Sequence, residues 1–364
     1  MRTLLFLLMT LPASAAGPLI FIGTYTRTTS QGIYAVRLDA ATGALSAPVL
    51  AAATPNPSFL ALSPGQEFLY AASESAAMAA AFATDLGAGT LRPLQAPQSS
   101  GGVAPCHLAV DPTGHALVVA NYHTGIVAAI PLQPDGTLGA PHVIPHSGHS
   151  VDPVRQTSPH VHCVNLSPDG RFVLVCDLGL DRIFSYRLDA ARALLAPAAT
   201  PFAATAPGTG PRHLAFGAGG RHVYAITEMG NTVVACDYDP ATGALTPRQS
   251  LPTLPPDFKG ASSGAEIQVH PNGRFLYASN RGHDSIAVFA IDGATGRLTP
   301  VEITPCGGKN PRSFSLSPDG AWLVCANQNS DSLTVLRVDA ATGRLTPTGH
   351  TAHVPLPVCV LFAR

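Results

Sequence analysis

The chain has 364 residues, a formal net charge of −1 and only 12% charged residues. A chain so close to neutral has no basic stripe for nucleic acid and no cationic surface for a membrane, so we expect neither partner. Its apolar content of 46% is typical of an ordered protein with a large buried core and argues against disorder.

The first sixteen residues have the pattern of a secretory signal peptide. Arg2 supplies the positive charge, Leu4 to Leu11 the short apolar stretch, and Ala13-Ser14-Ala15 the small-residue cleavage site. The apolar stretch is too short to span a bilayer. We therefore expect residues 1–16 to be removed on export, to the periplasm or the medium, and residues 17–364 to form one domain. The alternative is an uncleaved N-terminal strand.

After this segment, one pattern repeats along nearly the whole chain, with a period of about 50 residues. The clearest copies start at Ile267 and Phe314. Weaker copies start near Leu60, Leu108, Val164 and Leu214. Each copy contains short apolar segments separated by turns with Gly at fixed offsets, which predicts a four-stranded antiparallel meander. Such a unit is the blade of a β-propeller.

The turns of the repeat predict the number of blades. A Ser-Pro-Asp-Gly or related turn recurs six times and an Ala-Thr-Gly or related turn seven times, so one blade lacks its first strand. The segment 20–26 begins at the second-strand position, and the segment 356–362 is an unassigned strand. We therefore predict an all-β, seven-bladed propeller of four-stranded antiparallel blades, closed by N- and C-terminal strands that share one blade.

Strand direction then sorts the loops between the two faces of the disc. In an up-and-down meander, the first-to-second and third-to-fourth turns lie on one face, and the second-to-third loops and inter-blade links lie on the other. The short Gly turns therefore share one face, and the unusual polar residues converge on the other, around the mouth of the central channel. A site is expected there.

Five residues on that face are candidates for catalysis. His160 and His162 are two apart, so on a strand both project to the same side, and histidine is the usual general base. Arg212 and Arg281 can bind carboxylate or phosphate and steady an oxyanion. Glu228 could orient a histidine or activate water. The alternatives are a metal site at the histidines and ion pairs between blades.

Further residues on the same face are candidates for substrate binding. They are Arg312, Glu266, Asn280, Gln328 and Asp177. The long inter-blade link from His142 to His162 adds His146, His149 and Arg155-Gln156. Links of this length are commonly functional or mobile.

Seven cysteines are scattered singly through the repeats, and no C-x-x-C pair occurs. A zinc ribbon or thioredoxin-type site is therefore not expected. Cys163 and Cys176 fall on successive strands of one hairpin, where a disulfide could form after export. Buried free thiols are the more common arrangement, so both states are left open.

Taken together, these motifs resemble those of the lactonase family of seven-bladed propellers, the 6-phosphogluconolactonase type. The resemblance covers essentially the whole of residues 17–364. It is carried by Pro159-His160-Val161-His162, Ser167-Pro168-Asp169-Gly170-Arg171, Asp177-Leu178-Gly179, Gly210-Pro211-Arg212-His213, Glu228, Ala265-Glu266-Ile267, Ser279-Asn280-Arg281-Gly282, Asn310-Pro311-Arg312 and Ala326-Asn327-Gln328.

The resemblance implies hydrolysis of a sugar lactone, 6-phosphogluconolactone or, because the chain carries an export signal, an unphosphorylated aldonolactone. A related branch is similar to carboxymuconate cycloisomerases, whose His, two Arg and Glu correspond by motif to His160 or His162, Arg212, Arg281 and Glu228. It implies no metal and no organic cofactor. The expected partner is a small lactone, and the expected state is a monomer.

Three other functions remain as alternatives. One is a lactone-forming cycloisomerase of the carboxymuconate type. Another is a non-catalytic exported propeller that holds an anionic ligand in the same basic channel. The third, a calcium-dependent gluconolactonase of the regucalcin kind, would need an acidic ligand set that is not evident in the sequence.

Overall fold

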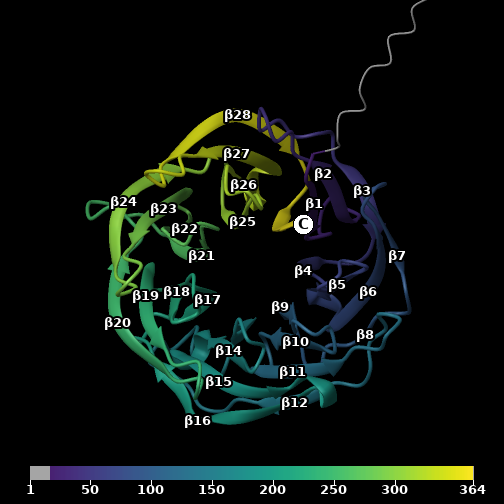
Figure 1. Cartoon of the computed structure of the whole chain (residues 1–364), viewed down its shortest axis with the longest axis vertical. Coiled ribbons are helices and arrows are strands. Elements are labelled where there is room, and N and C mark those ends of the chain that lie inside the picture. The colour runs from purple at the N-terminus through teal and green to yellow at the C-terminus, as the bar shows by residue number, and fades with distance from the viewer. Residues whose placement is uncertain (1–16, 364) are drawn as a thin grey trace, which may run out of the picture.

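The computed structural model describes residues 17–363, in which seven antiparallel sheets surround a central axis (Figure 1). The all-β, seven-bladed prediction is confirmed. The predicted signal peptide, residues 1–16, lies outside the described residues. Among the residues described, no helix has the length and apolar character needed to cross a membrane.

Each blade is a four-stranded meander that runs from an innermost strand at the channel to an outermost strand at the rim. From the inside outward, blade 1 contains β29 (Pro357–Phe362), β1 (Leu19–Thr24), β2 (Gly32–Arg37) and β3 (Val49–Ala53). Blade 2 contains β4 (Pro57–Leu62), β5 (Phe68–Ser73), β6 (Met78–Asp85) and β7 (Thr90–Pro93), and β8 (Gln98–Ser99) also pairs with β6. Blade 3 contains β9 (Pro105–Val110), β10 (Ala116–Asn121), β11 (Ile126–Pro131) and β12 (His142–Pro145).

The remaining blades follow the same order. Blade 4 contains β13 (Val161–Leu166), β14 (Phe172–Asp177), β15 (Arg182–Asp189) and β16 (Leu194–Ala204). Blade 5 contains β17 (Pro211–Phe216), β18 (His222–Thr227), β19 (Thr232–Tyr238) and β20 (Leu245–Pro252). Blade 6 contains β21 (Ser263–Val269), β22 (Phe275–Arg281), β23 (Ser285–Ile291) and β24 (Leu298–Pro305). Blade 7 contains β25 (Pro311–Leu316), β26 (Trp322–Asn327), β27 (Ser332–Val338) and β28 (Leu345–His353).

Four three-residue 3-10 turns complete the described secondary structure. They are η1 (Glu74–Ala76), η2 (Leu178–Leu180), η3 (Ala190–Arg192) and η4 (Gln328–Ser330). Three of them, η1, η2 and η4, follow the second strand of their blade, so they begin at the mouth of the channel.

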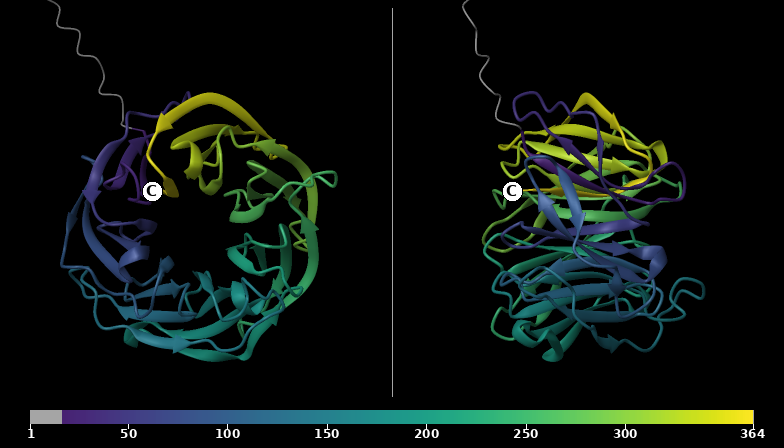
Figure 2. Two further views of the ribbon diagram at one scale, coloured as in Figure 1. Left: turned by 180° about the vertical axis from the view of Figure 1, so that it is seen from behind. Right: turned by 90° about the vertical axis from the view of Figure 1, so that its right-hand side faces the viewer.

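The two ends of the chain close the disc. β29 pairs antiparallel with β1, with Phe362 opposite Ile20 and Val360 opposite Ile22. The C-terminal strand therefore becomes the innermost strand of the blade that the N-terminus begins. Figure 2 shows the closed disc from behind and from its edge. This confirms the predicted shared blade, which leaves no open sheet edge between the first and last repeats.

The predicted turns fold locally, as their composition requires. In the turn between β13 and β14, Ser167 Oγ accepts from the backbone N–H of Phe172 and donates to Asp169. Gly170 takes a φ of 69°, which a side chain would disfavour. These short turns define the turn face of the disc, and the second-to-third loops and inter-blade links define the opposite, site face.

The core lies between neighbouring blades. Between blades 4 and 5, for example, Leu174 and Ile183 pack against Leu214 and Val223, all of them buried. All seven cysteines are buried free thiols. Cys163 lies directly opposite Cys176 in the β13–β14 pair, and the two are not bonded.

Candidate active site

Two sets of side chains surround the channel on the site face. One set comes from the ends of the second strands, and the other from the second residues of the innermost strands. The first set is Tyr25, Glu74, Tyr122, Leu178, Glu228, Arg281 and Gln328. The second set includes His162, Arg212 and Arg312.

A β-bulge presents each of these three innermost-strand residues. In blade 5 the pairing moves from Pro211 opposite Thr227 to His213 opposite Ile226, so Arg212 has no partner in β18. His162 and Arg312 are the extra residues of the equivalent bulges in β13 and β25. A bulge releases its extra residue from the ladder and re-aims its side chain. This local feature frees all three predicted side chains for contacts outside their own sheets.

Glu228 lies at the centre of the site. Its Oε2 accepts from Arg212 Nε at 3.0 Å and lies 2.8 Å from Arg281 Nη2, and its Oε1 accepts from Arg155 Nη2 at 2.7 Å. Arg212 is 2% exposed and Glu228 is 6% exposed. Three guanidinium charges around one carboxylate leave an excess of two positive charges. Because Arg212 and Glu228 are buried away from solvent, this excess would attract an anion strongly.

The carboxylate is an anchor for these arginines. Burial by itself would raise the pKa of Glu228, but the charges of Arg281 and Arg212 outweigh burial and hold the pKa well below its ordinary value. Burial and the neighbouring Arg212 lower the pKa of Arg281 to about 9, so its guanidinium is still charged at neutral pH. Glu228 is therefore ionised, and its geometry suits positioning better than proton transfer.

The arginines keep donors for a ligand. Arg212 Nη1 donates to the carbonyl of Ala265 at 2.7 Å, and Arg281 Nη2 donates to that of Gly264 at 3.1 Å. Arg212 Nη2 and Arg281 Nη1 have no hydrogen-bond partner among residues 17–363. Charge-assisted bonds from such donors are stronger than neutral ones.

His160 is held in one tautomer. Its backbone N–H donates to Asp177 Oδ1 at 2.8 Å, and its ring stacks on Tyr122 with centroids 4.5 Å apart. Its Nδ1 lies 3.1 Å from the carbonyl oxygen of Tyr122. Because a carbonyl can only accept, Nδ1 carries the hydrogen, and Nε2 of the neutral ring keeps a lone pair. The half-buried ring is therefore arranged to accept a proton.

His162 contacts the same tyrosine but lies deeper. Its ring centroid is 5.5 Å from that of Tyr122, and the residue is 4% exposed. Burial, and then the charge of Arg212, hold the pKa of His162 well below its ordinary value, so the ring is neutral. Its Nδ1 is buried without a partner among the described residues. The predicted pair of histidines thus meets around Tyr122.

Arg312 reaches the site face from blade 7. Its guanidinium carbon lies 5.5 Å from the ring centroid of Tyr25, and Arg27 lies 4.2 Å from that same centroid. The Tyr25 hydroxyl donates to Glu74 at 2.8 Å. Burial lowers the pKa of His162, and the charges of Arg212, Arg312 and Arg281 lower it further.

Below the bulges, the channel continues toward the turn face with a volume of about 1100 Å³. Glu266, His213, His107 and Phe59 line its inner end. Glu266 Oε1 lies 3.1 Å from His213 Nδ1, and burial raises the pKa of Glu266 to about 7. The predicted substrate residue Glu266 therefore lies one layer below the arginines.

Two other predicted residues make buried contacts inside the protein. Asn280 is fully buried and bonds to the carbonyl and hydroxyl of Thr253. Asp177 is also fully buried and lies 2.6 Å from His146 Nδ1 through one oxygen. Neither reaches the arginine cluster, so we leave both out of the proposed substrate contacts. Gln328 is half-buried at the mouth of the channel and accepts from Asn310.

The site contains two further residues to which the sequence assigned no role. Arg155, in the long link between blades 3 and 4, reaches Glu228 and the Tyr122 hydroxyl. Tyr122 supports both predicted histidines. The length of the link was a signal for Arg155, and Glu228 was itself a candidate, but nothing in the sequence indicated that these two residues, 73 apart, would pair.

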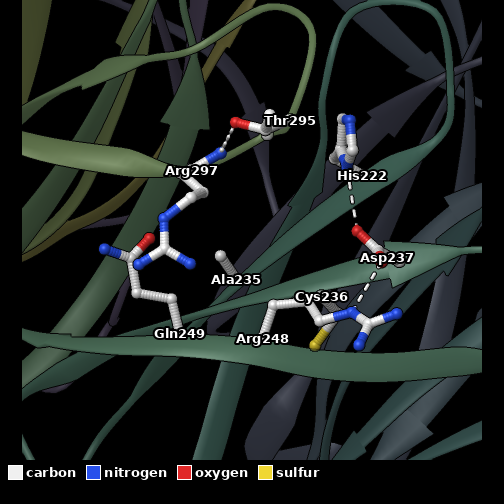
Figure 3. Close-up of a pocket in the computed structure, with 9 residues that line it drawn as sticks. His222, Ala235, Cys236, Asp237, Arg248, Gln249, Thr295 and Arg297 are labelled. Atoms are coloured by element: carbon white, nitrogen blue, oxygen red, sulfur yellow. Dashed lines mark hydrogen bonds and ion pairs between the residues drawn. The ribbon is translucent and has the colours of Figure 1, made fainter.

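A second, smaller hollow lies on the turn face between blades 5 and 6, and three of its lining side chains, His222, Asp237 and Arg248, are paired with one another (Figure 3). Asp237 lies 2.7 Å from Arg248 Nε and 3.4 Å from His222 Nδ1. At about 10 Å³ the hollow cannot hold a sugar. Among residues 17–363, no three His, Cys, Asp or Glu side chains are grouped as a metal site would require.

Comparison with known families agrees with this architecture. The family described as "Lactonase, 7-bladed beta-propeller" matches residues 19–362. The chain belongs to this lactonase family. It is thus an enzyme of the carboxylic ester hydrolase class, of the 6-phosphogluconolactonase type.

Named relatives of this lactonase come from several bacteria. A 6-phosphogluconolactonase of Bacillus subtilis is 38% identical over 345 residues, which cover 94% of this chain and 97% of the relative. A 6-phosphogluconolactonase of Formosa agariphila is 32% identical, covering 82% and 86%. The structure of the periplasmic gluconolactonase of Pseudomonas aeruginosa is similar with a TM-score of 0.89 and 34% identity, covering 95% and 99%.

Proposed function

We propose that this lactonase hydrolyses a sugar lactone on the site face, with His160 as general base and Arg212 and Arg281 as the oxyanion-binding groups. The observation that carries the proposal is an imidazole of defined tautomer stacked on Tyr122, whose hydroxyl accepts from Arg155 of the cluster with two excess positive charges. A base and an oxyanion site are the two groups that ester hydrolysis requires.

The reaction balances with these groups alone. His160 Nε2 takes a proton from water as the water oxygen bonds to the lactone carbonyl carbon. The carbonyl oxygen becomes an oxyanion, which the free donors of Arg212 and Arg281 stabilise more than they stabilise the neutral carbonyl. When the C=O bond re-forms, the bond from the carbonyl carbon to the ring oxygen breaks. The departing alkoxide then takes the proton from His160, which leaves a hydroxy acid.

The relatives and the signal pattern of residues 1–16 support a proposed substrate and location. The B. subtilis relative is named for a phosphorylated gluconolactone and the P. aeruginosa neighbour for gluconolactone, so both are candidate substrates of this chain. The neighbour is periplasmic. Together with the signal pattern of residues 1–16, this supports export of residues 17–364 to the periplasm.

The test is hydrolysis by the mature chain, residues 17–364. Freshly made 6-phosphogluconolactone and gluconolactone should each be followed against a blank, because both open spontaneously. We expect acceleration that Arg212→Ala reduces roughly 100- to 1000-fold, whereas Arg92→Ala, on the outer strand β7, keeps full activity. The assay is repeated with EDTA, which should not lower the rate.

Contrary outcomes point to the alternatives. Full activity of Arg212→Ala would remove it from the mechanism. No acceleration of either lactone, with loss of the ultraviolet absorbance of a carboxymuconate, would favour the cycloisomerase. Tight binding of a sugar acid without any turnover would favour a binding protein.

A further inference from the structure

The arginines of the site face fall into two groups with different partners. Arg155, Arg212 and Arg281 share Glu228. Arg312 makes no hydrogen bond or ion pair with any residue in the range 17–363, and its guanidinium contacts the face of the Tyr25 ring. A half-buried guanidinium normally has a carboxylate or carbonyl partner, because leaving its donors unmade is costly.

The surroundings explain how Arg312 is held without using its donors. The Tyr25 ring is 4% exposed and is contacted by two guanidiniums, at 5.5 Å for Arg312 and 4.2 Å for Arg27. A cation over an aromatic face is stabilised through the ring and keeps its N–H groups free. The nearby carboxylate of Glu74 is engaged by the Tyr25 hydroxyl and forms no ion pair with Arg312.

Position along the strand places Arg312 near the two proposed oxyanion-binding arginines. Arg312 and Arg212 are the extra residues of equivalent bulges in β25 and β17, on either side of blade 6, which contributes Arg281. Beside burial, the charges of all three guanidiniums contribute to the lowered pKa of His162. A ligand whose carbonyl lies at Arg212 and Arg281 therefore extends either toward blade 7 or away from it. A ligand that extends toward blade 7 meets the guanidinium of Arg312, whose donors are free.

We propose that Arg312, positioned by the ring of Tyr25, is an anion subsite that binds a phosphate or carboxylate carried by the substrate away from its lactone carbonyl. This inference rests on the proposed lactonase site and assigns different roles to its arginines. The Glu228 cluster holds the oxyanion, and Arg312 determines the preference for a charged lactone over a neutral one. Arg312 is a specificity-determining residue, and Tyr25 is a positioning residue.

The first test is the ratio of kcat/KM for 6-phosphogluconolactone to kcat/KM for gluconolactone. We expect Arg312→Gln to lower this ratio roughly 10- to 100-fold, the range for a lost charge-assisted bond. Arg312→Lys should recover part of the ratio, and Tyr25→Leu should lower it less than Arg312→Gln does. The matched control is Arg92→Gln, which should have the same ratio as the wild-type enzyme. Equal losses on both lactones, or no change in the ratio, would overturn the proposal.

The second test does not depend on turnover, so it separates failure of the subsite from failure of the lactonase assignment. Binding of glucose 6-phosphate, glucuronate and glucose to the mature wild-type chain is measured by calorimetry. We expect at least one of the two anions to bind tenfold or more tightly than glucose, and Arg312→Gln to abolish that advantage. The tighter anion identifies phosphate or carboxylate as the preferred group. Equal binding of all three sugars, or an advantage that survives in Arg312→Gln, refutes the anion subsite. Thermal melting of each variant confirms that it is folded.

Discussion

The two faces of the disc use charged residues in opposite ways. On the turn face, a carboxylate is satisfied by its own turn or by the adjacent strands: Asp292 Oδ1 accepts from the backbone of Ala294 and Thr295, and Asp237 lies between His222 and Arg248 (Figure 3). On the site face, Glu228 serves three guanidiniums, and Arg312 has no carboxylate partner among residues 17–363.

The difference separates residues that form the fold from residues that act on a ligand. The turn-face pairs of Asp292 are two and three residues apart, so they form as the hairpin forms. The partners of Glu228 are 16, 53 and 73 residues away, and they meet only when the blades are assembled. A concentration of like charges costs folding energy, so its presence on one face points to an anionic ligand.

The largest expected effect is on the proposed base of the site face. His160→Gln should lower kcat for lactone hydrolysis roughly 10²- to 10⁴-fold, because the variant has no lone-pair nitrogen to take the proton from water. His162→Gln, at the buried ring, should cost less. Steady-state rates above the spontaneous blank measure both. A greater loss in His162→Gln would move the role of the base to His162.

The anchor of the arginines should affect stability and activity together. Glu228→Gln leaves three guanidiniums without their shared charge, and breaking a buried ion pair in this way costs about 3–5 kcal/mol in the free energy of unfolding. Urea denaturation measures this loss, and the lactonase assay should show a loss of at least tenfold. A variant as stable as the wild type would mean that the arginines find other partners.

A pH-dependent effect is expected in the layer below the site. The pKa of Glu266 is about 7 in the folded chain against an ordinary value of 4.5, so the folded state keeps the proton longer than the unfolded state does. The stability from this group is therefore full below about pH 4.5 and is lost as the pH rises through 7. His213, His107 and Arg212 face the same carboxyl.

Glu266→Gln removes this titration while it keeps a neutral side chain. The free energy of unfolding of the variant relative to the wild type should therefore rise by about 3 kcal/mol between pH 5 and pH 8. Denaturation curves at both pH values give the difference. A difference that does not change with pH would show that the carboxyl titrates at its ordinary pKa.

The smallest effect is expected on the turn face. Asp237→Asn removes the carboxylate between His222 and Arg248, but Asp237 is 42% exposed and Arg248 is 58% exposed. Exposed pairs contribute about 0–1 kcal/mol, so thermal melting should change little and lactone hydrolysis should match the wild type. A large loss of activity would contradict the separation of the two faces.

Local pattern in the chain predicted the fold and part of the site. The Gly turns and strand lengths indicated seven blades and the shared first blade, and β29 pairs with β1 as expected. The convergence of His160, His162, Arg212, Glu228 and Arg281 followed from strand direction, and their contacts agree with it. The catalytic roles themselves stay predictions until the variants are assayed.

Side-chain orientation within the site could not be predicted in the same way. Asp177 and Asn280 stand at strand ends on the correct face, yet both turn inward to buried partners. Arg155 and Tyr25 belong to no motif in the sequence, and their roles depend on the residues of other blades that they contact. The sequence pattern places a residue on a face, but packing decides which way its side chain points.

The amino-acid sequence by itself determined the number of blades, the closure and the face that carries the polar residues, because turns and strands depend on residues close together in the chain. Only the tertiary structure decided that Glu228 collects three arginines and that Arg312 rests on Tyr25 without an ion-pair partner among residues 17–363. These contacts join blades far apart in the chain, and the bulges that aim Arg212 and Arg312 exist only once neighbouring strands have paired.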